Sequence, residues 1–179
     1  MIKKLIGIIR IIIIKIKYLG KFKILGKIYN NYISQFSNIN IIDGKIKIDD
    51  KIYMKKGSRI GVNKGGKIHI KSCYMNNNVL CISMGNIQIG KNVSIGPNTV
   101  IYDHDHAFNE NGKIDNEYKI GSVVIEDNVW IGAGVIILRN TTIGKNCIIG
   151  AGTIVKGNIP NNTIVTTNRE INIKKLVKK

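Results

Sequence analysis

The sequence contains few proline, cysteine and aromatic residues. Of 179 residues, two are proline, three are cysteine and 6% are aromatic, whereas glycine is frequent. This composition suits a narrow core of Ile and Val, and the length suits one domain. The cysteines, at positions 73, 81 and 147, form neither the spacing of a zinc site nor a disulfide framework. We therefore expect a reducing, cytoplasmic setting.

The first 42 residues contain no acidic residue and no long hydrophobic run. Within residues 1–27 the longest uncharged stretch is residues 5–9, far below the roughly 20 residues that span a bilayer. No signal-peptide cleavage pattern follows. Two interpretations stay open: a basic, apolar segment that contacts anionic lipid at the inner face of the membrane, or a helix or extension packed against the end of the fold. The lysine spacing gives no clean polar face, which favours packing.

The positive charge is concentrated at the two ends of the chain. The net charge is +17; eight basic residues precede residue 28 and four follow residue 173, which leaves +5 for the segment between them. Nucleic-acid binding usually needs a basic face with stacking aromatic residues or a known motif. The sequence has neither, so we do not expect a nucleic-acid partner.

A six-residue period dominates the C-terminal half. An aliphatic residue recurs at positions 125, 131, 137, 143, 149 and 155. A helix face would need spacings of three and four, and a single strand would need alternation, whereas hexapeptide periodicity is typical of a parallel β-helix. Three hexapeptides make one coil, so residues 18 apart should stack at about 4.8 Å. We expect Ile131 on Ile149 and Gly132 on Gly150, with the aliphatic residues pointing inward.

The repeat is irregular at first and is later interrupted. From residue 39 the pattern is strand-like without a hexad register, residues 89–101 are regular, and residues 103–122 are polar. Insertions in solenoids map to loops on one face and are usually functional. We therefore predict an N-terminal extension (1–38), a β-helix domain (39–165) with a protruding loop (103–122), and a basic tail (166–179).

The candidate chemistry lies at the entrance to that loop. It reads Asp103-His104-Asp105-His106, and these are two of the three histidines of the chain. A carboxylate beside an imidazole raises its basicity and fixes its tautomer, as a general base requires. The alternative is a solvated loop whose polar side chains cap turns.

Several motifs resemble the hexapeptide-repeat acyltransferases, in the branch of the maltose, galactoside and capsular-polysaccharide O-acetyltransferases. They are Val129-Trp130-Ile131-Gly132-Ala133, Ile143-Gly144-Lys145-Asn146, Ile149-Gly150-Ala151-Gly152-Thr153-Ile154-Val155 and Ile159-Pro160. The resemblance covers roughly residues 46–175. It implies an all-β, left-handed parallel β-helix that forms homotrimers with sites between subunits. It also implies acetyl-CoA-dependent O-acetylation of a sugar hydroxyl, in surface polysaccharide or glycoconjugate synthesis.

The resemblance implies roles for particular residues. His106 matches the general base, which takes a proton from the acceptor hydroxyl, and the backbone N–H of Ala133 matches the oxyanion donor. Either Asp103 or Asp105 would orient the imidazole. Acetyl-CoA would contact Gly132, Ala133, Ala151, Lys156 and Arg169. The sugar or glycan acceptor would contact Asn76, Asn78, Asp103, His104, Asp105 and Trp130. Ile82-Ser83-Met84 replaces an acidic residue of some sugar acetyltransferases, which leaves the acceptor open, and corner-forming asparagines are the alternative for Asn76 and Asn78.

Three other functions compete with this one. An amino-sugar N-acetyltransferase would use the same histidine and thioester. A hexapeptide carbonic anhydrase needs three histidine ligands to zinc, and the spacing of His69, His104 and His106 does not match, so no metal is expected. A non-catalytic trimeric scaffold would not need a loop that carries histidines.

Overall fold

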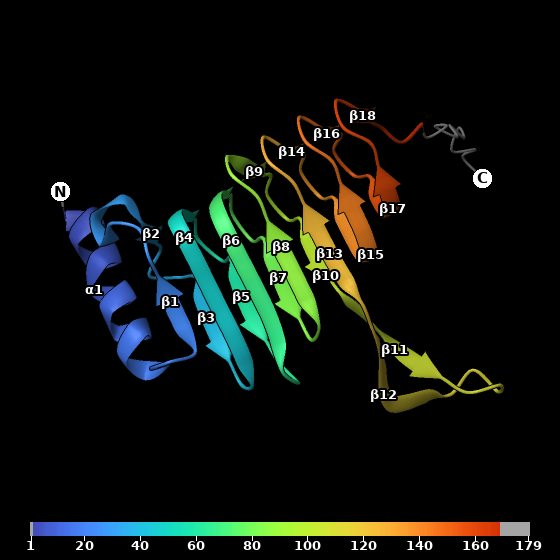
Figure 1. Cartoon of the computed structure of the whole chain (residues 1–179), viewed down its shortest axis with the longest axis horizontal. Helices are drawn as coiled ribbons and strands as arrows, with labels where there is room; N and C mark the ends of the chain where they lie inside the picture. The colour runs from blue at the N-terminus through green and yellow to red at the C-terminus, as the bar shows by residue number, and fades with distance from the viewer. Residues whose placement is uncertain (1, 169–179) are drawn as a thin grey trace, which may run out of the picture.

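The chain folds into a three-sided parallel β-helix. The computed structural model describes residues 2–168, and Figure 1 shows successive coils stacked along the long axis of the molecule. Each coil contributes one strand to each of three faces, and neighbouring coils pair in parallel. The predicted parallel β-helix is confirmed, because the narrow space between the three faces is filled by Ile, Val, Met and Cys side chains.

A column of stacked inward residues runs through all strands of the first face. Its strands are β3 (Asn38–Ile41), β5 (Arg59–Val62), β7 (Leu80–Ser83), β10 (Val100–Tyr102) and the first parts of β15 (Ile136–Ile143) and β17 (Ile154–Ile159). Its inward column is Ile39, Ile60, Cys81, Ile101, Ile137 and Val155.

The second and third faces are built in the same way. The second face comprises β1 (Phe22–Ile24), the first parts of β4 (Gly44–Met54) and β6 (Gly66–Met75), β8 (Asn86–Ile89), β13 (Ser122–Ile125) and the second parts of β15 and β17. The third face comprises β2 (Tyr32–Ile33), the second parts of β4 and β6, β9 (Val93–Ile95), β14 (Trp130–Ile131), β16 (Ile148–Ile149) and β18 (Ile164–Val165).

The hexad positions point inward as predicted. Ile131 pairs with Ile149, and all six periodic aliphatic side chains are at most 2% exposed. The early register differs because the early coils are longer. On the first face Ile39, Ile60 and Cys81 are 21 residues apart, whereas Ile137 and Val155 are 18 apart. Extra residues in the early coils, such as the longer strands β3, β5 and β7, therefore hide the hexad in the sequence while the stacking persists.

Asparagine ladders form two of the corners. Asn92, Asn128, Asn146 and Asn162 all have φ between 56° and 60°, a left-handed conformation that asparagine tolerates better than most residues. Their side-chain amides are linked in series by hydrogen bonds of 2.9–3.2 Å. A shorter ladder joins Asn78 to Asn98 at 3.1 Å. The corners thus supply both the backbone conformation and the bonding between coils.

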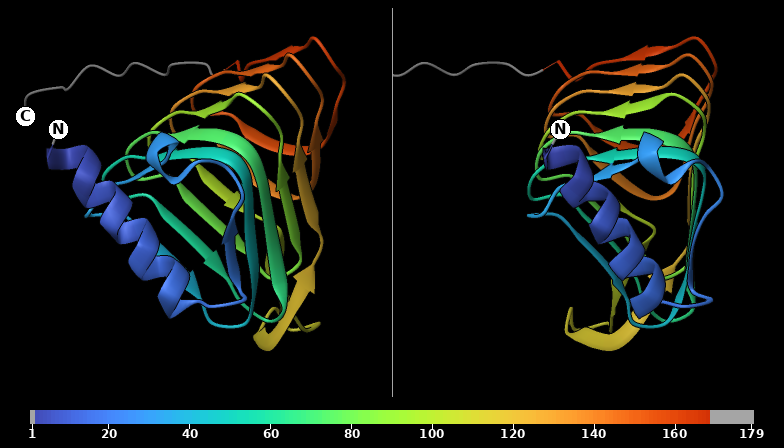
Figure 2. Two further views of the ribbon diagram at one scale, coloured as in Figure 1. Left: turned by 60° about the vertical axis from the view of Figure 1, so that its left-hand side comes forward. Right: turned by 90° about the vertical axis from the view of Figure 1, so that its left-hand side faces the viewer.

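A helix closes the N-terminal end. Helix α1 (Ile2–Lys17) lies across the first coils (Figure 2), followed by β1 and the short 3-10 helix η1 (Ile28–Asn30). Parallel pairing begins with Phe22 against Ile46, inside the segment that we expected to be an extension. In the part of the chain that the structure describes, no helix is long and apolar enough to cross a membrane.

Candidate functional site

The polar interruption of the repeat is a β-hairpin. Strands β11 (His104–Phe108) and β12 (Ile114–Ile120) pair antiparallel, with His106 opposite Tyr118. The hairpin leaves the wall directly after β10 and returns into β13, so it projects from the corner between the first and second faces (Figure 1). The segment predicted as a loop therefore has a defined backbone that fixes which side chains face each other.

Asp103 anchors the base of the hairpin. Its carboxylate is fully buried and accepts four hydrogen bonds. The donors are Ser83 Oγ at 2.5 Å, Met84 N at 2.9 Å, Gly85 N at 3.0 Å and His104 Nδ1 at 3.0 Å. Buried charged groups persist only where such partners satisfy them. The carboxylate therefore joins the preceding coil to the first histidine and assigns a proton to its Nδ1.

The two histidines lie in different surroundings. The side chain of His104 is 11% exposed, and its ring stands edge-on to Tyr102 and Tyr118, with centroids 5.4 and 5.8 Å away. His106 is exposed, and its ring lies 4.6 Å from that of Tyr118. Among the described residues, no carboxylate hydrogen-bonds to His106. Asp103 orients His104 instead, and the one aromatic ring of Tyr118 touches both imidazoles.

Asp105 turns toward the wall of the β-helix. Its carboxylate accepts a short hydrogen bond from Arg139 Nε, and the Arg139 side chain is 21% exposed. Tyr118 is on the other strand of the hairpin, β12, and Lys64 Nζ lies 4.3 Å from the centre of its ring. Arg139, Tyr118 and Ser83 were not among the predicted site residues. The available signals were a basic residue at a corner of the regular repeat and the single tyrosine of the polar insertion.

The predicted coenzyme contacts lie at another corner, between the third and first faces. There Gly132 N donates to Ile149 O at 2.7 Å, and a Cβ on Gly132 would come within 2.6 Å of Ala151 N. Only glycine fits such a close approach. Ala133 and Ala151 are exposed. Within residues 2–168, the Ala133 carbonyl accepts from Gly152 N at 2.8 Å, and no backbone hydrogen bond uses the Ala133 N–H.

The other predicted contacts are dispersed. Lys156 is exposed on β17, and Trp130 is 57% exposed on the outer side of the third face. Arg169 lies outside the described residues. Asn78 takes the left-handed corner conformation, with φ 58°, and Asn76 Oδ1 accepts from the next backbone N–H. Both asparagines thus stabilise the turn at this corner. Later coils place Ala133 and Ala151 at the same corner.

We call the corner that carries Gly132, Ala133 and Ala151 the glycine-rich corner. Within one chain, the hairpin and the glycine-rich corner do not meet. Ala133 precedes the start of β15, Asp103 follows the end of β10, and these two strands pair in parallel. The two groups therefore lie at opposite ends of the first face. A catalytic site that uses both needs a second copy of the chain.

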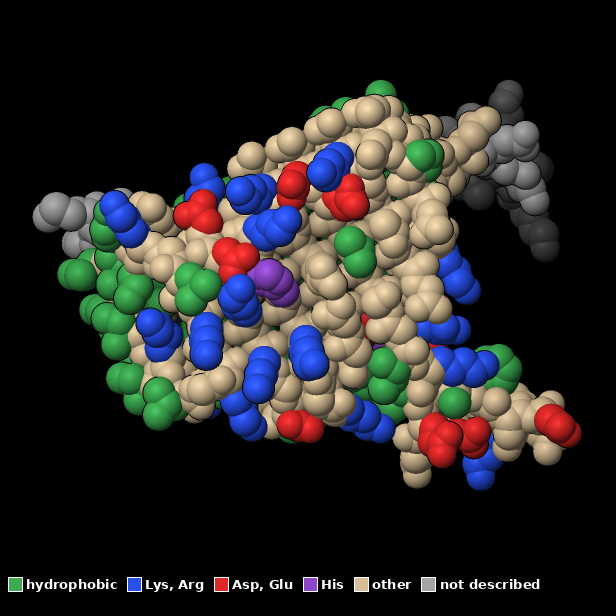
Figure 3. Space-filling model, in the orientation of Figure 1, with side chains coloured by type: hydrophobic (Ala, Val, Ile, Leu, Met, Phe, Trp, Pro, Cys, Tyr) green, Lys and Arg blue, Asp and Glu red, His purple; other side chains and the backbone are tan. Residues whose placement is uncertain are grey.

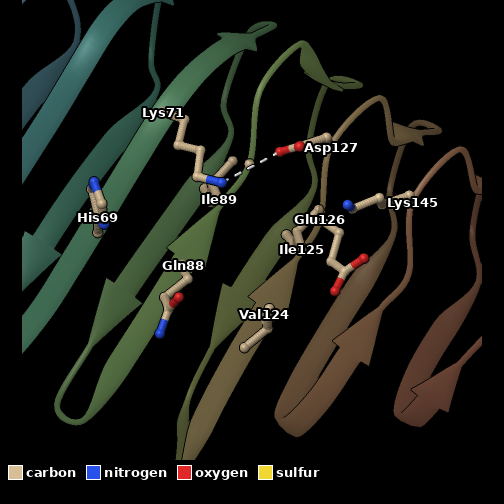
Figure 4. A pocket seen from close by; sticks show the side chains of 10 residues that line it. His69, Lys71, Gln88, Ile89, Val124, Ile125, Glu126, Asp127 and Lys145 are labelled. Carbon is tan, nitrogen blue, oxygen red and sulfur yellow. Dashed lines mark ion pairs between the residues drawn. The ribbon is translucent and has the colours of Figure 1, made fainter.

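A polar groove on the second face contains none of the predicted site residues. It has a volume of about 270 Å³ and is lined in part by His69, Lys71, Gln88, Asp127 and Lys145, as Figure 4 shows. A backbone hydrogen bond from Lys91 N in the preceding coil and the nearby lysines lower the pKa of Asp127 below its ordinary 3.8. These groups already neutralise one another, as in the 3.8 Å pair of Lys71 with Asp127.

The polar hydrogen bonds of this groove are local. His69 Nε2 lies 2.7 Å from Asp49 Oδ2, and the hydrogen bond from Lys47 lowers the pKa of Asp49. Among the described residues no three His, Cys, Asp or Glu side chains gather as a metal site would require. We therefore locate the candidate chemistry at the hairpin and the glycine-rich corner rather than here.

Comparison with known proteins agrees with this architecture. The family model described as bacterial transferase hexapeptide (six repeats) matches residues 122–157. Galactoside O-acetyltransferase of Lactococcus lactis is 38% identical over 104 residues, covering 57% of this chain and 50% of that protein. The Escherichia coli protein of the same name is 37% identical over 101 residues, covering 56% and 50%. The chain thus spans about half the length of these curated relatives.

A solved structure resembles nearly the whole chain. It is a mutant of AntD, an N-acyltransferase from Bacillus cereus, in complex with dTDP and coenzyme A. It is 25% identical, covers 90% of this chain and 88% of its own, and has a TM-score of 0.66. The six-residue repeat, the stacked coils and these relatives agree, and the chain belongs to the hexapeptide-repeat acetyltransferase family.

Proposed function

We propose that the protein transfers an acetyl group from acetyl-CoA to a sugar hydroxyl, in the synthesis of a surface polysaccharide or glycoconjugate. The observation that carries the proposal is the hairpin. Its two histidines project from the β-helix on strand β11, whose start is anchored by the buried Asp103 carboxylate. A positioned imidazole beside a bound thioester is the arrangement that direct acyl transfer needs.

His106 is the proposed general base. It is the exposed histidine of the pair, and it is the one that matches the family's base. As the acceptor oxygen attacks the thioester carbonyl, His106 takes the hydroxyl proton. The Ala133 N–H stabilises the oxyanion. When the tetrahedral intermediate collapses, the C–S bond breaks, and the CoA thiolate recovers the proton from the imidazolium. No covalent enzyme intermediate is needed.

The Asp103–His104 pair positions His106 in this proposal. Asp103 holds the His104 ring, His104 abuts the Tyr118 edge, and Tyr118 lies against His106. Asp105 is held away by Arg139, which leaves neither carboxylate on His106 in the isolated chain. An acceptor or a neighbouring subunit supplies the remaining contact of His106.

The proposed assembly is a homotrimer with its sites between subunits. The first face supports this, because its outer side carries exposed aliphatic residues next to polar ones such as Asn38, Asn40 and Arg59. Ile42, Ile136 and Ile154 are 63%, 36% and 59% exposed there, beside a groove of about 210 Å³ that includes Leu80 and Ile82. Covering this face with a second copy would bury apolar area. It would also let the hairpin of one copy meet the glycine-rich corner of another.

Coenzyme A would lie along that corner, next to Gly132, Ala133 and Ala151. Lys156, which follows Val155 at the opposite end of the first face, is the proposed cation contact. The missing Cβ of Gly132 keeps the coils close, and the exposed Ala133 offers its N–H. The chemistry that acetyl-CoA supplies when bound is an activated acyl group. The residues of the chain supply the proton acceptor and the hydrogen-bond donor.

N-Acylation of an amino sugar is the second candidate. The resemblance to an N-acyltransferase over nine-tenths of the chain favours it, and an amine can use the same histidine and thioester. A screen of sugars, amino sugars and lipid-linked glycans, with free CoA detected by its thiol, separates the two. No CoA release with any acceptor would favour the scaffold function.

Paired histidine variants test the mechanism. His106→Ala should lower kcat by about 10²–10⁴-fold, the usual loss when a general base is removed, with little change in CoA affinity. His104→Ala should cost less and act mainly on acceptor KM. His69→Ala, on the second face, is the matched control. If His104→Ala is inactive and His106→Ala is active, the roles are reversed. If both variants stay active, the proposed base is wrong.

A further inference from the structure

The outward side of helix α1 is apolar, although it faces away from the core. Gly7, Ile11, Ile14 and Tyr18 are buried against the first coils. Since successive helical residues turn by about 100°, the opposite side carries a different set. These side chains are 44–71% exposed, and they are Leu5, Ile9, Ile12, Ile13 and Ile16. A helix that only capped the end would carry polar residues there.

The chain after the helix extends this apolar area. Leu19 is 87% exposed and Leu25 is 63% exposed. A groove of about 440 Å³ beside the helix is lined mainly by apolar side chains, including Ile12, Ile16 and Leu19. Figure 3 shows hydrophobic side chains gathered at the end of the molecule that carries α1. We call the exposed apolar residues of α1, together with Leu19 and Leu25, the helix-end surface.

Basic residues flank the helix-end surface. On the helix, Arg10, Lys15 and Lys17 occupy the two sides between the buried stripe and the exposed apolar stripe. Arg10 donates a hydrogen bond of 2.8 Å to the Ser37 carbonyl of the first coils. Exposed lysines follow the helix at positions 21, 23 and 27. The first acidic residue of the chain is Asp43. An apolar stripe between cationic flanks is the pattern of helices that lie in a membrane interface.

We propose that the helix-end surface docks on an anionic lipid bilayer. The apolar side chains would enter the boundary between headgroups and acyl chains, and the basic flanks would face lipid phosphates. Charge decides against a second copy of the chain as the occupant. Two such surfaces face to face would oppose cationic flanks with no carboxylate between them, whereas an anionic surface complements them.

Docking would leave the hairpin accessible. The hairpin projects from the half of the β-helix remote from α1 (Figure 1). The inference rests on the N-terminal end alone and does not depend on acetyl transfer. Loss of lipid binding and loss of activity are therefore separate results.

The test is co-sedimentation of the full chain with lipid vesicles. One vesicle contains equal phosphatidylglycerol and phosphatidylcholine, and the other contains phosphatidylcholine alone. Ile16→Glu places a charge on the helix-end surface, where Ile16 is 71% exposed, so folding should not suffer. Ile164→Glu is the matched control, since Ile164 is 68% exposed on β18, in the last coil. Light scattering of the protein without vesicles is measured in parallel to detect self-association.

We expect the unmodified chain and Ile164→Glu to bind the anionic vesicles, and high salt to weaken binding. Ile16→Glu should reduce the partition coefficient at least tenfold. Three results would overturn the proposal. They are no binding to anionic vesicles, equal binding to both vesicle types, or equal binding by Ile16→Glu. Self-association that Ile16→Glu abolishes, without vesicle binding, would identify a second copy as the occupant instead.

Discussion

Replacing Asp103 with Asn tests whether one buried carboxylate holds the hairpin to the coil. Oδ1 accepts from Met84 N and His104 Nδ1, and Oδ2 accepts from Ser83 Oγ and Gly85 N. Asparagine keeps the shape but replaces one oxygen with an NH₂ group. The better orientation puts this group at the Oδ2 position, because the Ser83 hydroxyl can then accept from it and donate to the Lys67 carbonyl, 3.2 Å away.

That orientation leaves the Gly85 N–H without a partner. A buried unsatisfied donor costs about 1–3 kcal/mol, and the remaining bonds lose their charge assistance. We therefore expect Asp103→Asn to lower the free energy of unfolding by about 2–4 kcal/mol. In a domain of this size that is roughly 5–15 °C in Tm. Asp103→Ala removes the acceptor of the Met84 and Gly85 N–H groups and of His104 Nδ1, while Ser83 can still donate to the Lys67 carbonyl, so it should destabilise the fold more than Asp103→Asn does.

Thermal unfolding followed by circular dichroism measures the effect. Asp115→Asn is the matched control, because Asp115 is exposed on strand β12 of the same hairpin and should leave Tm within about 1 °C, as most surface substitutions do. If Asp103→Asn unfolds at the same temperature as this control, the carboxylate does not stabilise the fold, and the positioning role proposed for His104 loses its basis.

Three further predictions concern the core and the ionisable groups. Ile143→Lys should prevent folding, because an unpaired buried charge costs several kcal/mol or more, whereas exposed Ile164→Lys should fold normally by circular dichroism. Asp127 has a lowered pKa in the folded state, so its charge stabilises above the unfolded pKa and that contribution is lost as pH falls through the folded value. Asp127→Asn should lower Tm slightly at pH 7 and not near pH 2; an equal shift at both would contradict this. Burial raises the pKa of the Cys73 and Cys81 thiols, so Ellman's reagent should react with them only after unfolding, and rapid reaction at pH 8 would disprove this.

The sequence allowed the later coils to be predicted and left the earlier ones uncertain. The 18-residue spacing from Ile131 to Ile149 repeats the hexad without extra residues, so period and structure coincide. The spacing from Ile39 to Ile60 is 21 residues, and the hexad disappears although the stacking is the same. Pairing between coils persists across such insertions because it depends on which residues face inward, not on a constant number between them.

The interruption of the repeat was predictable in position, but the contacts of its polar side chains were not. The change from aliphatic repeat to Asp103-His104-Asp105-His106 located the hairpin, because a polar run cannot continue the core. Which carboxylate meets which imidazole depends on the coil before and the coil after. Asp103 faces Ser83 in the earlier coil, and Asp105 faces Arg139 in the later one. Neither contact follows from a periodic spacing in the sequence, so the sequence left both Asp103 and Asp105 as possible partners of His106.

The hairpin is inserted without disturbing the core register. Ile101 and Ile137 stack directly although they are 36 residues apart, whereas Ile137 and Val155 are 18 apart. The insertion therefore has the length of one whole coil, and apart from the buried Asp103 at its start it contributes no inward residue to any face. Its residues make no core contacts to preserve, apart from the anchors at Asp103 and Asp105. A β-helix of this kind can consequently change the hairpin, and with it the acceptor that we propose it meets, while the stacked aliphatic columns keep the fold.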